Sequence, residues 1–549
     1  MTSNEKGNEP RTRRTTLSQL GILFVAVILI SGSLGYLIGA VDGPSGFGTV
    51  IEPGGMVEDA SFIIFKDGST YYAKNGTTGA IDYSDSNLTS IFDSVIDANP
   101  DGGTIRFKQS EYTLSYDLVL DVDNIALVAD PGVTIIAEFG AEVTIPILVT
   151  GNNCTIRGFK FDGNNPVTTG ISPMIELRGD GNTFEGNILT NCKFYGVQFY
   201  NATNGKCINN IISKCQYGIA ISGVGSLQTY TRGVIVQGNI ISDCNDVAIK
   251  LRWCSSVVVS SNIIDINDVS WGDDNGGGIF CYHGDGPCID VTIHENMVQD
   301  SGKVGTGMGI AVTGDATGFA EGIAILGNNV RDCYYGINVG WNNLTIQGNM
   351  IHGRSTGHSG IYSTAQDNQI SSNSIHDTGI YCYQDVSGTV LDGNTIQGGN
   401  QYFRVDGDGI GIATQSYTVS DVVIKNNILA NIDDYGVNIY FTAGWIYPDN
   451  TIIEGNVFEN CTTGAILNAG TNTSIKYNVG YVTENKGTAT ITTTTFVTFA
   501  HSLATTPTLV LASFNLASYG NYTWTATTTE ITITVSTSGT YTVYWYAEV

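Results

Sequence analysis

The sequence predicts an all-β protein whose main part is a three-sided parallel β-helix. Only 14% of the residues are charged, glycine occurs 68 times, and long amphipathic helices are nearly absent. The stretch at 234–253, VIVQGNIISDCNDVAIKLRW, holds two short alternating patterns around a polar corner. A stretch of about 20 residues cannot bury a core alone. It is therefore interpreted as one coil of a repeat.

The N-terminus predicts a membrane anchor. Residues 1–16 are polar and include Arg13 and Arg14, and the uncharged run Leu17–Val41 is long enough to span a bilayer. Arginines before the run place the N-terminus in the cytoplasm and the β-helix outside the cell. We expect a cytoplasmic tail at 1–16, a single-pass anchor at 17–41 and a linker at 42–60. A signal peptide cleaved at Ala40 is the alternative.

The segment 61–116 is predicted to cap the first coil. Ser86 or Asn87 can begin a helix over Leu88–Ala98, and the sequence Asn99-Pro100-Asp101-Gly102-Gly103 stops it. A lone helix before a β array suits an end cap, because the first coil otherwise exposes its apolar end to water.

Asparagines mark the coils, which are predicted at 117–487. Each opens a short apolar run, and the smallest gaps between them, 21 to 24 residues, fit one three-sided turn. We expect each Asn to adopt the left-handed backbone of a tight corner and to hydrogen-bond from coil to coil. The positions are 187, 210, 239, 262, 296, 328, 349, 373, 394, 427, 456 and 478.

A strand led by glycine follows most of these asparagines, as in YGVQF, YGIAI, YGINV and YGVNI. Its alternation directs apolar residues inward and the others outward, so these strands should stack into one sheet. Cys192, Cys215 and Cys244 each lie five residues after their Asn. They are predicted to stack in the core as thiols, with cross-linking under oxidation as the alternative.

The last segment, 488–549, is rich in threonine and carries alternating runs such as Glu530–Val535 and Tyr541–Tyr546. Five or six short strands would fit a small C-terminal β-sandwich. Its sequence HSLATTPTLVLASF resembles small β-domains of surface and phage tail-like proteins, which serve binding or assembly.

The coils resemble the right-handed parallel β-helix repeats of the pectate-lyase-like superfamily over roughly residues 60–485. The opening at 79–114 is similar to the entry segment of rhamnogalacturonase- and epimerase-like β-helices, although Gln109-Ser110-Glu111-Tyr112 lacks the usual glycine before tyrosine. The resemblance implies a right-handed single-stranded β-helix whose chemistry lies on the outer face of the glycine-led sheet. It implies no activity, because many members have none.

The outward positions of that sheet are rich in aromatic and amide side chains, which suits a sugar-binding groove. Tyrosine is also simply a good strand residue, so the two interpretations stay open. The predicted substrate-binding residues are Tyr200, Phe280, Tyr282, Asn338, Tyr362, Tyr381 and Tyr383.

Lys250 and Arg252 are two outward cations on one strand of a chain that is poor in basic residues. One could neutralise the carboxylate of a uronic acid while the other abstracts its C5 proton, which is β-elimination. Surface ion pairs are the alternative interpretation. The predicted catalytic set adds residues from the next coil: Asp273, Asp274 and His283.

Charge and motif content limit the partners. The net charge of −27 argues against nucleic-acid binding, since phosphate would be repelled. No cofactor is expected, although Asp406-Gly407-Asp408-Gly409 resembles a fragment of a Ca²⁺ loop. Analogy with other β-helices suggests a homotrimer.

Two functions fit the sequence. One is a cell-surface protein that binds and cleaves an acidic polysaccharide, as a lyase rather than a glycoside hydrolase, because the acid pattern of the hydrolases is missing. The alternative is a non-catalytic adhesin, envelope protein or spike-like structural protein.

Overall fold

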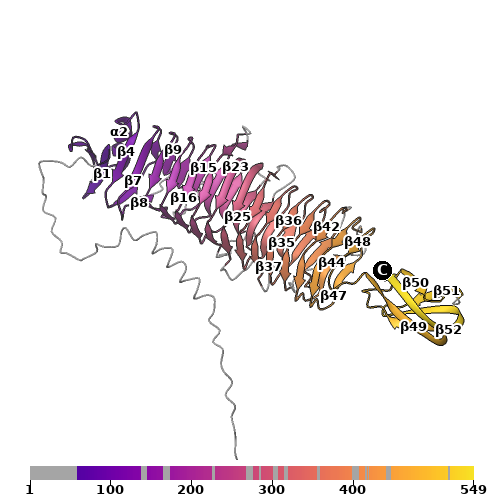
Figure 1. Cartoon of the computed structure of the whole chain (residues 1–549). Coiled ribbons are helices and arrows are strands. Elements are labelled where there is room, and N and C mark those ends of the chain that lie inside the picture. The colour runs from indigo at the N-terminus through magenta and orange to yellow at the C-terminus, as the bar shows by residue number, and fades with distance from the viewer. Residues whose placement is uncertain are drawn as a thin grey trace, which may run out of the picture. The chain divides into compact units, whose positions relative to one another are not determined.

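The computed structural model is a parallel β-helix and a C-terminal antiparallel sheet (Figure 1). It describes residues 59–137, 145–164, 173–225, 229–266, 276–282, 286–300, 307–313, 320–354, 359–398, 407–414, 417, 419–440, 447–516 and 520–549. Each coil contributes one strand to each of three parallel sheets, here named A, B and C in chain order. The predicted all-β parallel β-helix is confirmed.

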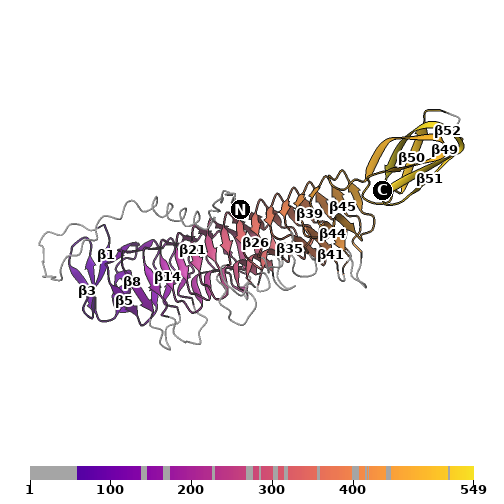
Figure 2. The same ribbon diagram turned by 90° about the horizontal axis from the view of Figure 1, so that it is seen from below.

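The strands of the three sheets follow one another from coil to coil (Figure 2). Sheet A contains β4 (Gly103–Phe107), β7 (Ile125–Ala129), β10 (Thr155–Arg157), β13 (Thr183–Glu185), β16 (Lys206–Ile208), β19 (Thr231–Arg232), β20 (Ile235–Gln237), β23 (Cys254–Ser260), β26 (Cys288–His294), β29 (Ala320–Glu321), β30 (Ala324–Leu326), β33 (Thr345–Gln347), β36 (Gln369–Ser371), β39 (Val390–Asp392), β42 (Val423–Lys425), β45 (Ile452–Glu454) and β48 (Ser474–Lys476). Sheet B contains β5 (Glu111–Leu114), β8 (Thr134–Ala137), β11 (Lys160–Asp162), β14 (Ile188–Thr190), β17 (Ile211–Ser213), β21 (Ile240–Ser242), β24 (Ile263–Asp265), β27 (Met297–Gln299), β31 (Asn329–Arg331), β34 (Met350–His352), β37 (Ser374–His376), β40 (Thr395–Gln397), β43 (Ile428–Ala430) and β46 (Val457–Glu459).

Sheet C contains the strands that the glycine-led pattern predicts. They are β6 (Leu118–Leu120), β9 (Ile147–Val149), β12 (Ile175–Leu177), β15 (Tyr195–Tyr200), β18 (Tyr217–Ser222), β22 (Val247–Arg252), β25 (Gly277–Tyr282), β28 (Met308–Thr313), β32 (Tyr335–Val339), β35 (Ser359–Ser363), β38 (Ile380–Tyr383), β41 (Ile410–Ala413), β44 (Tyr435–Tyr440) and β47 (Gly464–Asn468). The first coil starts at β4, ahead of the boundary at residue 117 that the sequence analysis used.

A cap covers the N-terminal end of the stack. The antiparallel strands β1 (Phe62–Asp67), β2 (Thr70–Asn75) and β3 (Ile81–Asp85) precede helix α2 (Leu88–Asp97). The Asn87 side chain accepts a hydrogen bond from the Thr89 backbone N–H at 2.9 Å, so Asn87 caps the helix as predicted. Ile91, Phe92 and Val95 of the helix lie in the same buried core as the coils, which removes the exposed apolar end.

The predicted asparagines form one continuous hydrogen-bonded line, the asparagine ladder, at the corners between sheets A and B. The side-chain oxygen of each Asn accepts hydrogen bonds from the backbone N–H and the amide Nδ2 of the Asn one coil earlier. Asn328 Oδ1, for example, accepts from both nitrogens of Asn296 at 3.0 Å, while Asn328 Nδ2 donates to the Ile293 carbonyl at 2.9 Å. The ladder runs unbroken from Asn187 to Asn478.

The expectation that the ladder residues themselves adopt the left-handed backbone is wrong. The residue before each of them does so: φ is 63° at Gly186, 66° at Gly238 and 56° at Glu295. Glycine suits that position because it lacks a Cβ, and other residue types accept the strain there. The ladder Asn is therefore needed for its buried amide and not for a tolerant backbone.

The cysteines are thiols, as predicted. All eleven are free, and Cys192, Cys215 and Cys244 lie on successive coils at the corner between sheets B and C. Contact with Cys215 and burial raise the pKa of the Cys192 thiol, and burial raises that of Cys244. Buried neutral thiols act as small apolar side chains and are unreactive.

The C-terminal segment is a single antiparallel sheet of four strands, β49 (Glu484–Ala500), β50 (Leu509–Phe514), β51 (Tyr522–Ala526) and β52 (Glu530–Glu548). The predicted sandwich of five or six strands is not what forms. The runs at 530–535 and 541–546 belong to one long strand, β52, which pairs with β49 along one edge. Strands β50 and β51 pair with the other edge of β52. Ile533, Val543 and Trp545 belong to a hydrophobic core of this sheet that is separate from the core of the coils.

The predicted membrane anchor at 17–41 lies outside the described residues. No helix in the described part of the chain is long and apolar enough to cross a membrane. The cell-surface location stays a prediction.

Breaking the ladder should destabilise the stack. In Asn328→Leu, the backbone N–H of Asn296 loses its acceptor, Asn296 Nδ2 loses one of its partners and the Ile293 carbonyl loses a donor, and each buried polar group left unpaired costs about 1–3 kcal/mol. We expect the free energy of unfolding to fall by about 2–5 kcal/mol, measured by chemical denaturation. Asn329→Leu, which changes the outward neighbour, is the control; equal losses in both variants would contradict the role of the ladder.

Candidate functional site

The longer insertions flank one sheet. From β10 onward, each corner between sheets A and B is a pair of residues, such as Gly186-Asn187. The segments that enter sheet C are longer in several coils, as between β24 and β25 and between β40 and β41. Binding residues concentrate on loops held by a rigid scaffold, so the outer face of sheet C is the candidate site.

The alternation of the glycine-led strands is interrupted at the glycine, and the residue before it lies on the outer face. Tyr195 lies in a cluster on the outer face, whereas Val197 and Phe199 lie in the core. A Cβ added to Gly196 would meet the Gly218 carbonyl oxygen at 2.7 Å, so the coils stack too closely here for a side chain. Each such strand therefore presents an extra outward residue at its start.

The pairing of neighbouring strands in sheet C aligns a second set of outward residues, further along each strand, in a column that runs from coil to coil. In coil order the column is Glu176, Gln198, Ala220, Lys250, Phe280, Ala311, Asn338, Tyr362, Tyr381, Gly411 and Asn438. The column changes character along its length, from charged and apolar to aromatic and amide side chains.

A second apolar cluster covers the first half of this face. Tyr195, Tyr217, Ala220, Val247, Phe280 and Ala311 are buried together, outside the main core. Phe280 is only 6% exposed, and a Cβ on Gly277 would meet its ring at 2.1 Å. The ring predicted to stack on sugars is thus used in packing.

The two predicted cations lie beside this cluster on β22. The Lys250 ammonium is 4.8 Å from the centre of the Tyr217 ring, a cation–π contact. Arg252 Nε donates to Ser222 Oγ at 3.3 Å. Burial and a hydrogen bond with Asp246 raise the pKa of Tyr217. Both cations are half-buried and occupied by contacts within the face.

Four tyrosines form a row over the next coils, here called the tyrosine row: Tyr335, Tyr362, Tyr381 and Tyr383. The ring centres of Tyr335 and Tyr362 are 5.0 Å apart, those of Tyr362 and Tyr381 are 5.7 Å apart, and those of Tyr381 and Tyr383 are 5.8 Å apart. Burial raises the pKa of Tyr335 to about 12. Tyr362 and Tyr383 keep part of their rings exposed.

Two amides accompany the row. Asn338 Nδ2 donates to Met308 Sδ at 3.3 Å. Asn438 Nδ2 donates to Asp408 Oδ2 at 2.8 Å, and Asp408 Oδ1 accepts from the Tyr435 N–H at 3.0 Å. Asn438 Oδ1 is buried and has no hydrogen-bond partner within the described part of the chain. This oxygen is an acceptor that a ligand or water donor could satisfy.

The structure brings together part of the predicted site. Lys250 and Arg252 lie on one strand, β22. Tyr362, Tyr381 and Tyr383 belong to the tyrosine row. Three predicted catalytic residues lie outside the described residues: Asp273, Asp274 and His283. Tyr282 is the last residue of β25. Tyr200 is near the other end of the face, with the Arg178 guanidinium 5.6 Å from its ring centre.

Sequence reasoning missed the acid at the start of the column. Glu176 is 4% exposed and forms an ion pair with Arg178. Its strand, Ile175–Leu177, has no leading glycine, so it was not aligned with the others, although its apolar–polar alternation was visible. Tyr217 and Tyr335 were missed because simple alternation along the strand would direct them inward. The alternation is interrupted at the glycine that follows each of them, so they lie on the outer face.

No metal site is apparent. The described residues contain no group of three or more His, Cys, Asp or Glu side chains that could hold a metal ion. Of the segment that resembles a fragment of a Ca²⁺ loop, Asp406 lies outside the described residues, and both Asp408 oxygens accept hydrogen bonds from protein donors.

The family follows from comparison with known proteins. A model described as the right-handed β-helix region matches residues 146–320 and 308–480, which together make up more than half of the chain. The chain belongs to the right-handed β-helix family. The predicted right-handed β-helix is therefore confirmed. The resemblance to the pectate-lyase-like superfamily, and that of the entry segment to rhamnogalacturonase- and epimerase-like proteins, stay predictions.

Solved structures of this β-helix fold include the tailspike protein of E. coli bacteriophage HK620. The tailspike in complex with a pentasaccharide is 13% identical, with a TM-score of 0.57 over 84% of this chain and 90% of the tailspike. A mutant in complex with a hexasaccharide is 13% identical, with a TM-score of 0.58 over 84% and 89%. At this identity the likeness shows the fold alone. No curated protein sequence matches the chain.

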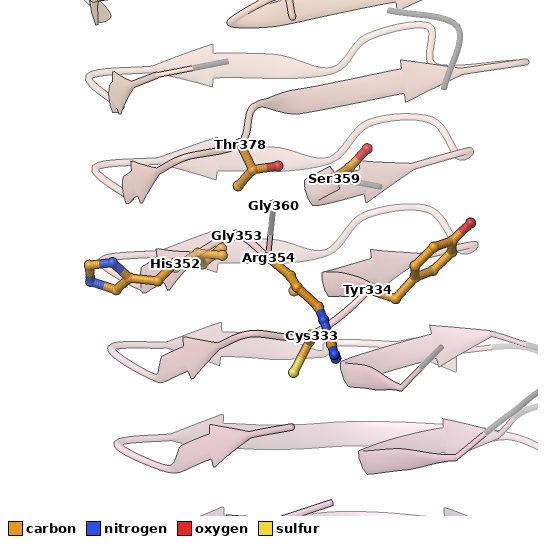
Figure 3. A pocket seen from close by; sticks show the side chains of 10 residues that line it. Cys333, Tyr334, His352, Gly353, Arg354, Ser359, Gly360 and Thr378 are labelled. Atoms are coloured by element: carbon orange, nitrogen blue, oxygen red, sulfur yellow. The ribbon is translucent and has the colours of Figure 1, made fainter. Parts of the chain in front are cut away.

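A recess at the corner between sheets B and C of the β-helix is a competing candidate site (Figure 3). Gly353 and Gly360 line it, each packed closely against Thr378, and the Arg354 side chain runs from it toward Cys333 (Figure 3). Arg354 Nη1 lies 3.4 Å from Asp300 Oδ2, and the Asp300 side chain is fully buried. The recess does not admit a water-sized molecule, so it is a packing feature and not a binding site.

His352 borders that recess and makes the stability of the β-helix depend on pH. Its ring stacks on His376 with centres 4.9 Å apart. Burial, followed by the nearby Arg331 and His376, lowers its pKa from 6.5, while Asp377 and Asp332 oppose the shift. As the pH falls, the unfolded chain binds a proton more readily than the folded one, so stability is lost below about pH 6.5.

We expect His352→Gln to reduce this loss. The thermal midpoint should fall less between about pH 8 and about pH 5 in the variant than in the natural chain, because the variant has no imidazole to protonate. His294→Gln, at the end of β26, controls for removing an imidazole elsewhere. An unchanged pH dependence in His352→Gln would show that the stacked pair does not contribute.

Proposed function

We propose that this chain is a spike-like β-helix protein that binds a polysaccharide on the outer face of sheet C without cleaving it. The tyrosine row carries this proposal. Tyr335, Tyr362, Tyr381 and Tyr383 continue from ring to ring over successive coils, and aromatic faces stack on the apolar faces of sugar rings. An extended ligand suits a row that extends along the coils.

The amides beside the row support the same proposal. Sugars need hydrogen-bond partners for their hydroxyl groups, and Asn338 and Asn438 lie in the same outward column as Tyr362 and Tyr381. The HK620 tailspike, which shares the fold, is described in complex with oligosaccharides.

The contacts of the two cations favour binding over β-elimination. A base must give up its own proton before it can take one from the sugar. The Tyr217 ring contacts Lys250 as a cation, and Arg252 donates a hydrogen bond to Ser222, so both side chains act as cations and donors within the face. Each cation can still neutralise an acidic group of the ligand, so an acidic polysaccharide remains within the proposal.

Binding should depend on the tyrosine row. We expect Tyr362→Ala and Tyr383→Ala to weaken binding about tenfold or more, equal to about 1.4 kcal/mol, on an array of neutral and acidic oligosaccharides followed by calorimetry on the best binder. Tyr116→Ala removes an exposed tyrosine before β6, far along the chain from the row, and is the control. Wild-type affinity in both row variants would place the binding site elsewhere.

No elimination products should form. Incubating the protein with acidic polysaccharides should yield no unsaturated, ultraviolet-absorbing sugars. If such products appeared and were lost in Lys250→Ala or Arg252→Ala, the lyase hypothesis would replace the binding proposal. Products that persist in both variants would point to a different catalytic group or to a contaminating enzyme, which repurification by ion exchange and size exclusion would separate.

A further inference from the structure

Four asparagines at the corner between sheets C and A begin an Asn-x-Ser/Thr triplet, the acceptor motif of N-linked glycosylation. Each lies in the segment that joins a sheet C strand to the next sheet A strand, and no triplet has proline in the middle. All four are exposed, with φ between 50° and 60°. They are here called the corner asparagines: Asn153, Asn201, Asn343 and Asn472.

The triplets direct their first and last side chains outward. The middle residue is buried in the core, as at Ala202 and Leu344. The hydroxyl residues that complete these two triplets, Thr203 and Thr345, are half-buried at the surface. The asparagine and the hydroxyl residue therefore lie on the same, outer side of the chain.

The fold does not require this combination of residues. Thr155, Thr345 and Ser474 are each the first residue of a sheet A strand. In other coils the same register position holds side chains without a hydroxyl group: Lys206, Ile235, Val258, Ala324 and Gln369. Two residues earlier, glycine or aspartate also adopts the left-handed backbone, as at Gly322 and Asp290. The corner geometry is therefore met without an Asn-x-Ser/Thr triplet.

The asparagine ladder carries no such triplet, although its residues are also asparagines. The residue two places after a ladder Asn is a buried apolar residue, as Ile351 is after Asn349, except after the last, where it is Gly480. Further triplets lie away from the corner between sheets C and A: at Asn75, Asn87, Asn460 and Asn521. This corner is therefore where the triplets recur along the β-helix.

We propose that the corner asparagines carry N-linked glycans. The reaction forms a bond between Asn Nδ2 and the anomeric carbon of an oligosaccharide, breaks the bond from that carbon to the phosphate of a lipid-linked donor, and releases a proton from the amide. A glycan is bulky and hydrophilic, so it needs an amide that faces water, as these four do. The transfer takes place outside the cytoplasm, so the proposal depends on the predicted export of the β-helix.

The amides stay compatible with the fold after the transfer. Asn472 Nδ2 donates to Asp449 Oδ1 at 2.8 Å. An amide nitrogen has two hydrogens, so one still reaches Asp449 when a sugar replaces the other. Each corner asparagine follows a sheet C strand, so the glycans border the outer face of that sheet. They are attached covalently to the chain, which makes this proposal independent of ligand binding at the tyrosine row.

Mass spectrometry of the full chain, exported by cells that have an N-glycosylation pathway, tests the proposal. The digested peptides are treated in heavy-oxygen water with an amidase that removes the glycan and leaves a heavy-labelled Asp. We expect this label at all four corner asparagines. Asn204 and Asn450 should stay unlabelled: both are exposed at the same corner with a left-handed backbone, but neither has a hydroxyl residue two places later. A digest without the amidase controls for spontaneous deamidation.

Substitutions at Thr345 separate the modification from the fold. Thr345→Ala should abolish the label at Asn343 and leave that at Asn201, whereas Thr345→Ser should keep both. The fold accepts alanine here, because Ala324 holds the same register position one coil earlier. An exported chain without label at the corner asparagines would overturn the proposal. So would a chain that stays in the cytoplasm, or a label at Asn343 that survives in Thr345→Ala.

Discussion

Each coil from β13 onward depends on the hydrogen bonds of a single buried amide. Burying an unpaired amide costs free energy, so an isolated Asn in an apolar core would destabilise it. In the asparagine ladder each amide supplies the partners of the next, and the spare donor reaches a strand carbonyl. A shift in register between two coils would leave buried polar groups unpaired, so the ladder fixes the stacking of all three sheets.

The ladder also explains where the molecule can vary. It fixes the corner between sheets A and B at a residue pair, and no insertion is accommodated there without breaking the line of amides. The other two corners contain no such line and differ in length from coil to coil. The candidate site on sheet C therefore lies beside the variable segments.

Features that recur in successive coils could be predicted from the sequence, whereas features of single coils were missed. The ladder positions, the glycine-led strands and the stacked cysteines recur from coil to coil, so the pattern of one coil supports the interpretation of the next. The outward face has no such redundancy. Phe280 alternates like Tyr362 but is buried, because Gly277 gives its ring room to fold against the strand. Glu176 was missed because its strand lacks the glycine that marked the sheet. The sandwich prediction failed because alternation cannot tell two short strands from one long strand such as β52.

Since each ladder amide contacts only the coils directly above and below it, a whole coil is a unit that the chain can gain or lose. Duplicating the segment from one ladder Asn to the next would restore every hydrogen bond across the new junction, whereas an insertion of part of a coil would not. Sheet C would lengthen by about 4.8 Å with each added coil. The length of its outer face can thus change by duplication or deletion within the gene, in whole steps, with the cap and the C-terminal sheet left as they are.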